Sequence, residues 1–302
     1  MVHEQSTARE SGSGAELAAR AGLHLARHKL LLDFHDELHT AAVRVKQHQG
    51  VAAIHAVRVQ ARRLRTLLNV WRRDCQPQLH AQLQFDLRDV GRTLAPARET
   101  DVRYQLFMAL IRRAGNHEVE TEALMLKLQQ ARAVERRCLR AMLHEAMWLH
   151  RLERIQHGIS DQHLLALPKR SGFTADVNMF ARKIRRLNER LGRKKHGMRY
   201  LHSLRIAVKK TRYFGEALHA LGARIDEPLL PTLRKLQNLL GELHDSWQML
   251  QWLSACDLDD ACRQAVMRMW QARFEDRRQR FERFKKTVLR KGLLAGRTHE
   301  SV

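Results

Sequence analysis

HAVRVQARRLR, at residues 55–65, has a second copy further along the chain: HSLRIAVKKTR, at residues 202–212. The two copies are 147 positions apart and share their order of histidine, apolar and basic residues. On a helix that turns ~100° per residue, the histidine and three of the cations in each copy fall within a sector of roughly 80°. These stripes consist of His55, Arg58, Arg62 and Arg65 in the first copy, and His202, Arg205, Lys209 and Arg212 in the second.

The other side of each copy is apolar, which predicts a helix packed against a core. Residues 51–73 contain no Asp or Glu. A solvated helix usually alternates its charges, because pairs of opposite sign one turn apart offset the repulsion between like charges. If the two stripes face each other, their positive charges have no acids nearby to balance them. They would form a cationic channel in which the positive electrostatic potential is concentrated. We therefore expect a negatively charged ligand between the two helices.

The composition agrees with a helical protein that has a polyanionic partner. The chain has 302 residues, of which 44% are hydrophobic, with five prolines and abundant helix-forming residues. Fifty-five Lys and Arg residues against 32 Asp and Glu give a formal net charge of +23. Nucleic acid, an acidic membrane surface and a phosphate polymer are the natural partners for such a charge. A basic surface without a specific ligand is the alternative.

We predict an all-α fold of two homologous antiparallel four-helix-type bundles, related by a pseudo-two-fold axis, with a basic groove between them. The repeat also includes Leu87-Arg88 and Leu233-Arg234, which lie on the following helix of each half. The expected organisation is a disordered leader (1–14), a first half (15–157), a linker (158–172) and a second half (173–295). The expected helices cover residues 15–47, 51–73, 78–94, 99–114, 119–156, 175–191, 200–221, 229–240, 243–256 and 259–290.

Motifs of catalysis, metal binding and membrane insertion are not found in the sequence. Walker and G-x-S-x-G motifs are missing, and the four cysteines lack C-x-x-C spacing, so we predict a binding protein without cofactor rather than an enzyme. The pairs His24/His28 and His35/His39 have a spacing that could hold a metal, but no third ligand is evident, and no metal site is predicted. The polar N-terminal segment and the lack of an apolar span predict a cytoplasmic location without membrane insertion.

Nucleic acid is the main rival to a phosphate polymer as the ligand. Proteins that bind single strands place aromatic rings among their cations so that bases can stack. The two stripes contain no aromatic residue, and the whole chain is 6% aromatic. This favours a ligand made of phosphate alone, while nonspecific RNA binding and a role as a basic interaction scaffold stay open.

The two copies together resemble the CHAD domain family, the conserved histidine α-helical domain. HAVRVQARRLR is similar to its first signature and HSLRIAVKKTRYFGEAL to its second, while LAPARETDV and LLGELHDSW resemble two loop segments that follow the third helices. The resemblance implies binding of inorganic polyphosphate in a basic groove and association with polyphosphate granules. The ligands it implies are His55, Arg58, Arg62, Arg63, Arg65, His202, Arg205, Lys209, Lys210 and Arg212, with Arg88, Arg234 and Lys235 as further candidates. Glu99 and His244 depart from the usual Asp and Asn of the family.

Overall fold

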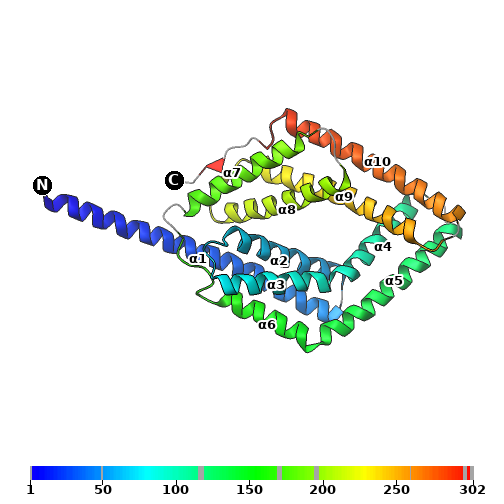
Figure 1. Cartoon of the computed structure of the whole chain (residues 1–302), viewed down its shortest axis with the longest axis horizontal. Coiled ribbons are helices and arrows are strands. Elements are labelled where there is room, and N and C mark those ends of the chain that lie inside the picture. The colour runs from blue at the N-terminus through cyan, green and yellow to red at the C-terminus, as the bar shows by residue number, and fades with distance from the viewer. Residues whose placement is uncertain are drawn as a thin grey trace.

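The structure is a computed structural model that describes residues 2–48, 50–114, 119–168, 172–193, 197–258, 260–294 and 298–299. Within these ranges the chain forms ten helices and one pair of two-residue strands (Figure 1). The predicted all-α class is confirmed. The pseudo-two-fold relation between the halves stays a prediction.

The helices follow one another with short connections. The first six are α1 (Val2–His48), α2 (Val51–Val70), α3 (Pro77–Thr93), α4 (Ala95–Ala114), α5 (Val119–His144) and α6 (Ala146–Ser160). The last four are α7 (Gly172–Leu191), α8 (Met198–Ala220), α9 (Leu229–Ala255) and α10 (Asp260–Arg290). Strand β1 (Arg224–Ile225) pairs antiparallel with β2 (Thr298–His299).

Several predicted boundaries differ from the structure. Helix α1 begins at Val2 instead of after a disordered leader at residues 1–14, and the segment contains no proline that would end a helix. The helix predicted over residues 119–156 is divided at Glu145, whose extended backbone separates α5 from α6 although the apolar periodicity continues. The two helices predicted around Gly241 are one helix, α9, because a single glycine does not interrupt it. The predicted linker at 158–172 is shorter, since α6 continues to Ser160.

Three buried clusters form the core. The first consists mainly of residues of α1, α2, α3 and α6, and the second of residues of α7, α8, α9 and α10. The third cluster, around Phe107 and Trp270, joins α4 and α5 to the C-terminal part of α9 and the N-terminal part of α10. Figure 1 shows where these four helices meet. The apolar positions predicted for the two repeated helices, such as Leu64 and Phe214, are fully buried. The helices that carry the cationic stripes are therefore held in place by the packing of their apolar faces in the core.

A buried ionic cluster also ties the start of the second half to the first. Arg27 on α1 is 2% exposed and contacts Asp74 Oδ2 at 3.0 Å and Asp176 Oδ2 at 2.5 Å. Trp71 Nε1 donates a hydrogen bond to the same oxygen of Asp176 at 3.0 Å. Because Asp176 lies on α7 and the other residues lie in the first half, this cluster fixes α7 against α1 and the end of α2.

Gly215 is a packing requirement of α8, and we predict that Gly215→Ala destabilises the protein by about 1–3 kcal/mol through overpacking. A Cβ atom there would lie 2.7 Å from Phe180 Cζ and 2.9 Å from Leu230 Cδ2. Chemical denaturation measures the change. Gly22→Ala in α1 is the matched control, since a Cβ there meets nothing within 4 Å. The control should gain up to about 1 kcal/mol from helix propensity, and equal effects of the two variants would contradict the packing argument.

Candidate anion-binding site

The two repeated helices lie side by side, and α4 and α9 complete their surroundings. Helix α2 packs against α8, α4 packs against α2, and α9 packs against both α4 and α8. Charged side chains from all four helices influence one another at this junction. We call this group the central cluster: His55, Arg58 and Arg62 on α2, Arg98 on α4, His202, Arg205 and Lys209 on α8, and His244 and Asp245 on α9.

Lys209 is the most buried cation of the central cluster, with 7% of its surface exposed. Burial, together with the charges of Arg62, Arg205 and Arg58, lowers the pKa of its ammonium from 10.5 to about 6, against an opposing effect of Asp245. Burial also lowers the pKa of Arg58 to about 10, with Arg62 adding to the effect. The arrangement thus holds several cations close together without enough negative charge to balance them.

The same causes lower the pKa values of the histidines of the cluster. Desolvation lowers the pKa of His55 and His202, and neighbouring cations contribute. The pKa of His244 is lowered to about 4, first by burial and then by Arg205. The rings of His202 and His244 lie 4.6 Å apart between centroids. An anion placed among these rings would favour their protonated, hydrogen-bond-donating forms.

Two polar atoms of the central cluster are buried without a hydrogen-bond partner among the described residues: Arg205 Nε and His244 Nδ1. Buried polar atoms are nearly always satisfied, so each such atom calls for an explanation such as a ligand. Asp245 supplies one carboxylate; burial raises its pKa, while Arg205, Arg277 and Arg98 act in the opposite direction. Glu99 and Asp101 also act on Arg58 and Arg98, but both carboxylates pair with arginines outside the cluster. The remaining positive charge leaves room for an anionic ligand.

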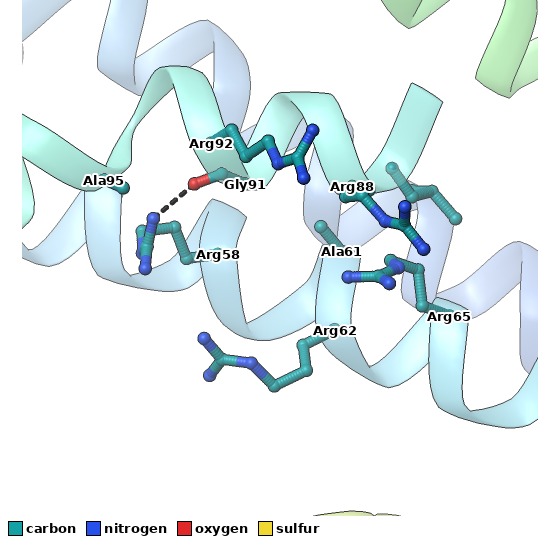
Figure 2. A pocket seen from close by; sticks show the side chains of 9 residues that line it. Arg58, Ala61, Arg62, Arg65, Arg88, Gly91, Arg92 and Ala95 are labelled. Carbon is teal, nitrogen blue, oxygen red and sulfur yellow. Dashed lines mark hydrogen bonds between the residues drawn. The ribbon is translucent and has the colours of Figure 1, made fainter. Parts of the chain in front are cut away.

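A pocket of about 290 Å³ opens between α2 and α3, beside the central cluster. Five arginines line it, and we call it the arginine pocket: Arg58, Arg62, Arg65, Arg88 and Arg92, together with Ala61, Leu87, Gly91 and Ala95. Figure 2 shows Arg65 and Arg88 extending toward each other from the two helices, while Arg58 reaches the carbonyl oxygen of Gly91. Burial and the charges of Arg88, Arg62 and Arg92 lower the pKa of Arg65.

Other predicted ligands lie away from both regions. Glu216 pairs with Arg63 at 3.5 Å, with Arg234 at 3.5 Å and, at a shorter distance, with Arg212. Arg63 also lies over the rings of Phe34 and Tyr213, so it acts as an interhelical packing residue.

Lys210 and Lys235 complete the set of predicted ligands. Lys210 is exposed near Lys183 of α7, and Lys235 Nζ lies 4.5 Å from the ring centroid of Phe284. The structure therefore divides one predicted set of ligands into the central cluster, the arginine pocket, three arginines paired with Glu216, and two lysines outside these groups. Whether each residue binds a ligand stays a prediction.

Three charged residues of these regions were missed by the sequence analysis: Arg92, Arg98 and Asp245. The spacing of four residues between Arg88 and Arg92 was an available signal, because it places both on one side of α3. Arg98 and Asp245 lie in the segments LAPARETDV and LLGELHDSW, which are helical in the structure and belong to α4 and α9. Only the packing of these helices against α2 and α8 brings both residues to the cluster.

The histidine pairs of α1 serve packing in the structure. His28 Nε2 contacts the carbonyl oxygen of Ile159 at 2.7 Å, and His35 is buried beside Asp36. Across the described ranges, no group of three or more His, Cys, Asp and Glu side chains is arranged to hold a metal ion. The helices described by the structure include none with the length and apolarity needed to cross a membrane.

A family model for the CHAD domain matches residues 29–254, which include both repeated helices and all four helices of the central cluster. The chain belongs to the CHAD domain family. No curated protein matches the sequence.

Two solved structures share the fold of this CHAD domain. The CHAD domain from the plant Ricinus communis is 20% identical with a TM-score of 0.70, covering 92% of this chain and 94% of its own. PptA from Streptomyces chartreusis is 16% identical with a TM-score of 0.69, covering 87% of this chain and 99% of its own. At these identities the similarity shows the fold alone.

Proposed function

We propose that the protein binds inorganic polyphosphate through the central cluster and the adjoining arginine pocket. The observation that supports this most strongly is the concentration of arginines from α2, α4 and α8 around one buried lysine, with Arg205 Nε and His244 Nδ1 lacking hydrogen-bond partners within the described part of the chain. Arginine donates paired hydrogen bonds to phosphate oxygens, and lysine adds a compact charge. Some members of the CHAD family bind polyphosphate, which agrees with this chemistry.

The proposal favours a phosphate polymer over nucleic acid. The arginine pocket is lined by arginines, small residues and one leucine, with no aromatic ring on which a base could stack. We extend the proposal to a cytoplasmic protein that associates with polyphosphate granules, since a granule presents the same polymer at high density. We also propose that the protein acts by binding rather than by catalysis, because the charged groups of the cluster are mostly arginines, which stay protonated and serve poorly as a general acid or base.

We expect long-chain polyphosphate to bind at least about tenfold more tightly than tRNA or duplex DNA at equal salt concentration, because the arginine pocket offers no aromatic ring on which a base could stack. Titrations monitored by fluorescence anisotropy, with each ligand competing against labelled polyphosphate, measure the preference. The logarithm of affinity should fall with the logarithm of salt at a slope of roughly −0.7 per phosphate contacted, if the coefficient for single strands applies. Comparable affinities for all three polymers would instead indicate a nonspecific polyanion binder.

A further inference from the structure

The arginine pocket differs from the central cluster in having no carboxylate of its own. In the ranges that the structure describes, none of its five arginines forms an ion pair. Their polar contacts are neutral: Arg58 donates to the carbonyl oxygen of Gly91, and Arg65 Nε donates to Gln84 Oε1 at 3.4 Å. The pocket therefore carries a local excess of positive charge in a concave space that is open to solvent.

The internal repeat relates this pocket to a region between α8 and α9 whose charge is different. Arg212 is the counterpart of Arg65, and Arg234 is the counterpart of Arg88. Both of these second-half arginines pair with Glu216, and Arg212 Nε also donates to Gln237 Oε1 at 2.8 Å. The two regions thus have similar arginines but unequal free charge.

One position explains part of this difference. Glu216 lies 147 positions after Asn69, the offset that relates the two repeated helices. Asn69 lies one turn beyond Arg65 on α2, as Glu216 lies one turn beyond Arg212 on α8, and Asn69 is exposed. A neutral side chain in the first half therefore replaces the carboxylate that neutralises the second half.

We propose that the arginine pocket between α2 and α3 is a discrete site for a short phosphate chain such as tripolyphosphate, and that Glu216 prevents the repeat-related region between α8 and α9 from acting as a second one. The inference rests on the proposed polyphosphate binding and refines it. A long polymer would be anchored at the first half and would continue over the central cluster. The binding surface is then asymmetric although the sequence is repeated.

The test compares two double variants that remove the same charge from repeat-related helices. Arg88→Gln with Arg92→Gln alters the pocket outside the central cluster, and Arg234→Gln with Lys235→Gln alters the second half; all four side chains are exposed, so the fold should be retained. Isothermal titration with tripolyphosphate should show about a tenfold or larger loss of affinity for the first variant, as expected for lost charge-assisted hydrogen bonds. The second variant should change affinity by less than about twofold, as expected for exposed cations away from the ligand.

Asn69→Glu provides an independent measurement, because it adds to the first half the carboxylate found in the second. We expect it to weaken tripolyphosphate binding by about fivefold or more, through pairing with Arg65 and repulsion of the ligand. Equal losses of affinity in the two double variants would contradict the proposal that the arginine pocket binds tripolyphosphate. An unchanged affinity of the Arg88 and Arg92 variant would contradict it as well. Wild-type protein that binds long-chain polyphosphate but not tripolyphosphate would overturn the inference alone. Failure to bind either ligand would overturn the proposed function as well.

Discussion

Replacing Arg58 and Arg205 together with glutamine should weaken the binding of long-chain polyphosphate by about a hundredfold or more. The two arginines occupy matching positions of the repeated helices, and both are influenced by Arg62. Arg58 lines the arginine pocket, and Arg205 carries a buried Nε without a hydrogen-bond partner. Each arginine is expected to lose one charge-assisted hydrogen bond of about 1.5 kcal/mol. Their sum, about 3 kcal/mol, corresponds to roughly a hundredfold change in affinity.

The control removes the same charge from a surface away from the site. Arg268 and Arg283 are exposed on α10, so Arg268→Gln with Arg283→Gln should reduce affinity by less than about threefold, through long-range electrostatics that salt screens. Fluorescence titration at two salt concentrations measures both variants, and thermal denaturation verifies that both fold. If the control loses as much affinity as the Arg58 and Arg205 variant, binding depends on net charge and not on a site.

The sequence was sufficient to predict the fold class and the stripes, because both depend on local periodicity. The apolar positions of the repeated helices recur at helical spacing, and the structure buries them. The break at Glu145 and the continuity of α9 were not predictable in this way, because apolar residues recur equally well through a bend and through an intact helix. Boundaries of this kind depend on tertiary packing more than on propensity.

The sequence alone did not predict which cations of the repeated helices are paired with a carboxylate. Arg62 and Arg63 are adjacent in sequence, yet Arg62 lines the pocket while Arg63 crosses to Glu216 and two aromatic rings. No acid lies within residues 51–73, and the neutralising carboxylate comes from α8 instead. Ion pairs between distant parts of a chain have no signature in local spacing, so only the structure separates the available cations from the neutralised ones.

Lys209 is expected to make polyphosphate affinity strongly pH-dependent between about pH 6.5 and about pH 8.5. In the free protein burial lowers the pKa of Lys209 to about 6, so its amine is mostly neutral over this range. The groups that face it are Arg58 and Arg62 on α2, Arg205 on α8 and Asp245 on α9. A bound polyanion favours the ammonium form, so binding takes up a proton, and affinity should fall up to about tenfold per pH unit as the pH rises.

Lys209→Met separates this effect from the other titrating groups. The pKa values of the cluster histidines are lowered from 6.5 in the free protein and are raised by a bound polyanion, so the histidines take up protons mainly below this window and in its lower part. The variant should bind more weakly than the wild type near pH 6.5 and lose the part of the pH dependence that extends toward pH 8.5. Titrations in buffers of different ionisation enthalpy measure the proton uptake directly, with Lys286→Met, an exposed lysine on α10, as the control.

The same depressed pKa predicts how the stability of the ligand-free protein responds. Unfolded Lys209 keeps a pKa near 10.5, so between about pH 6 and about pH 10 the unfolded chain binds one more proton than the folded one. The contribution of Lys209 to stability therefore rises with pH across this window, and below about pH 6 the burial of its charge is fully destabilising. Lys209→Met should raise the melting temperature near pH 6 by roughly 5 °C or more while weakening polyphosphate binding. A variant that lost both stability and binding would show that Lys209 serves the fold, whereas opposite changes in the two quantities are the result expected of a lysine retained for its ligand.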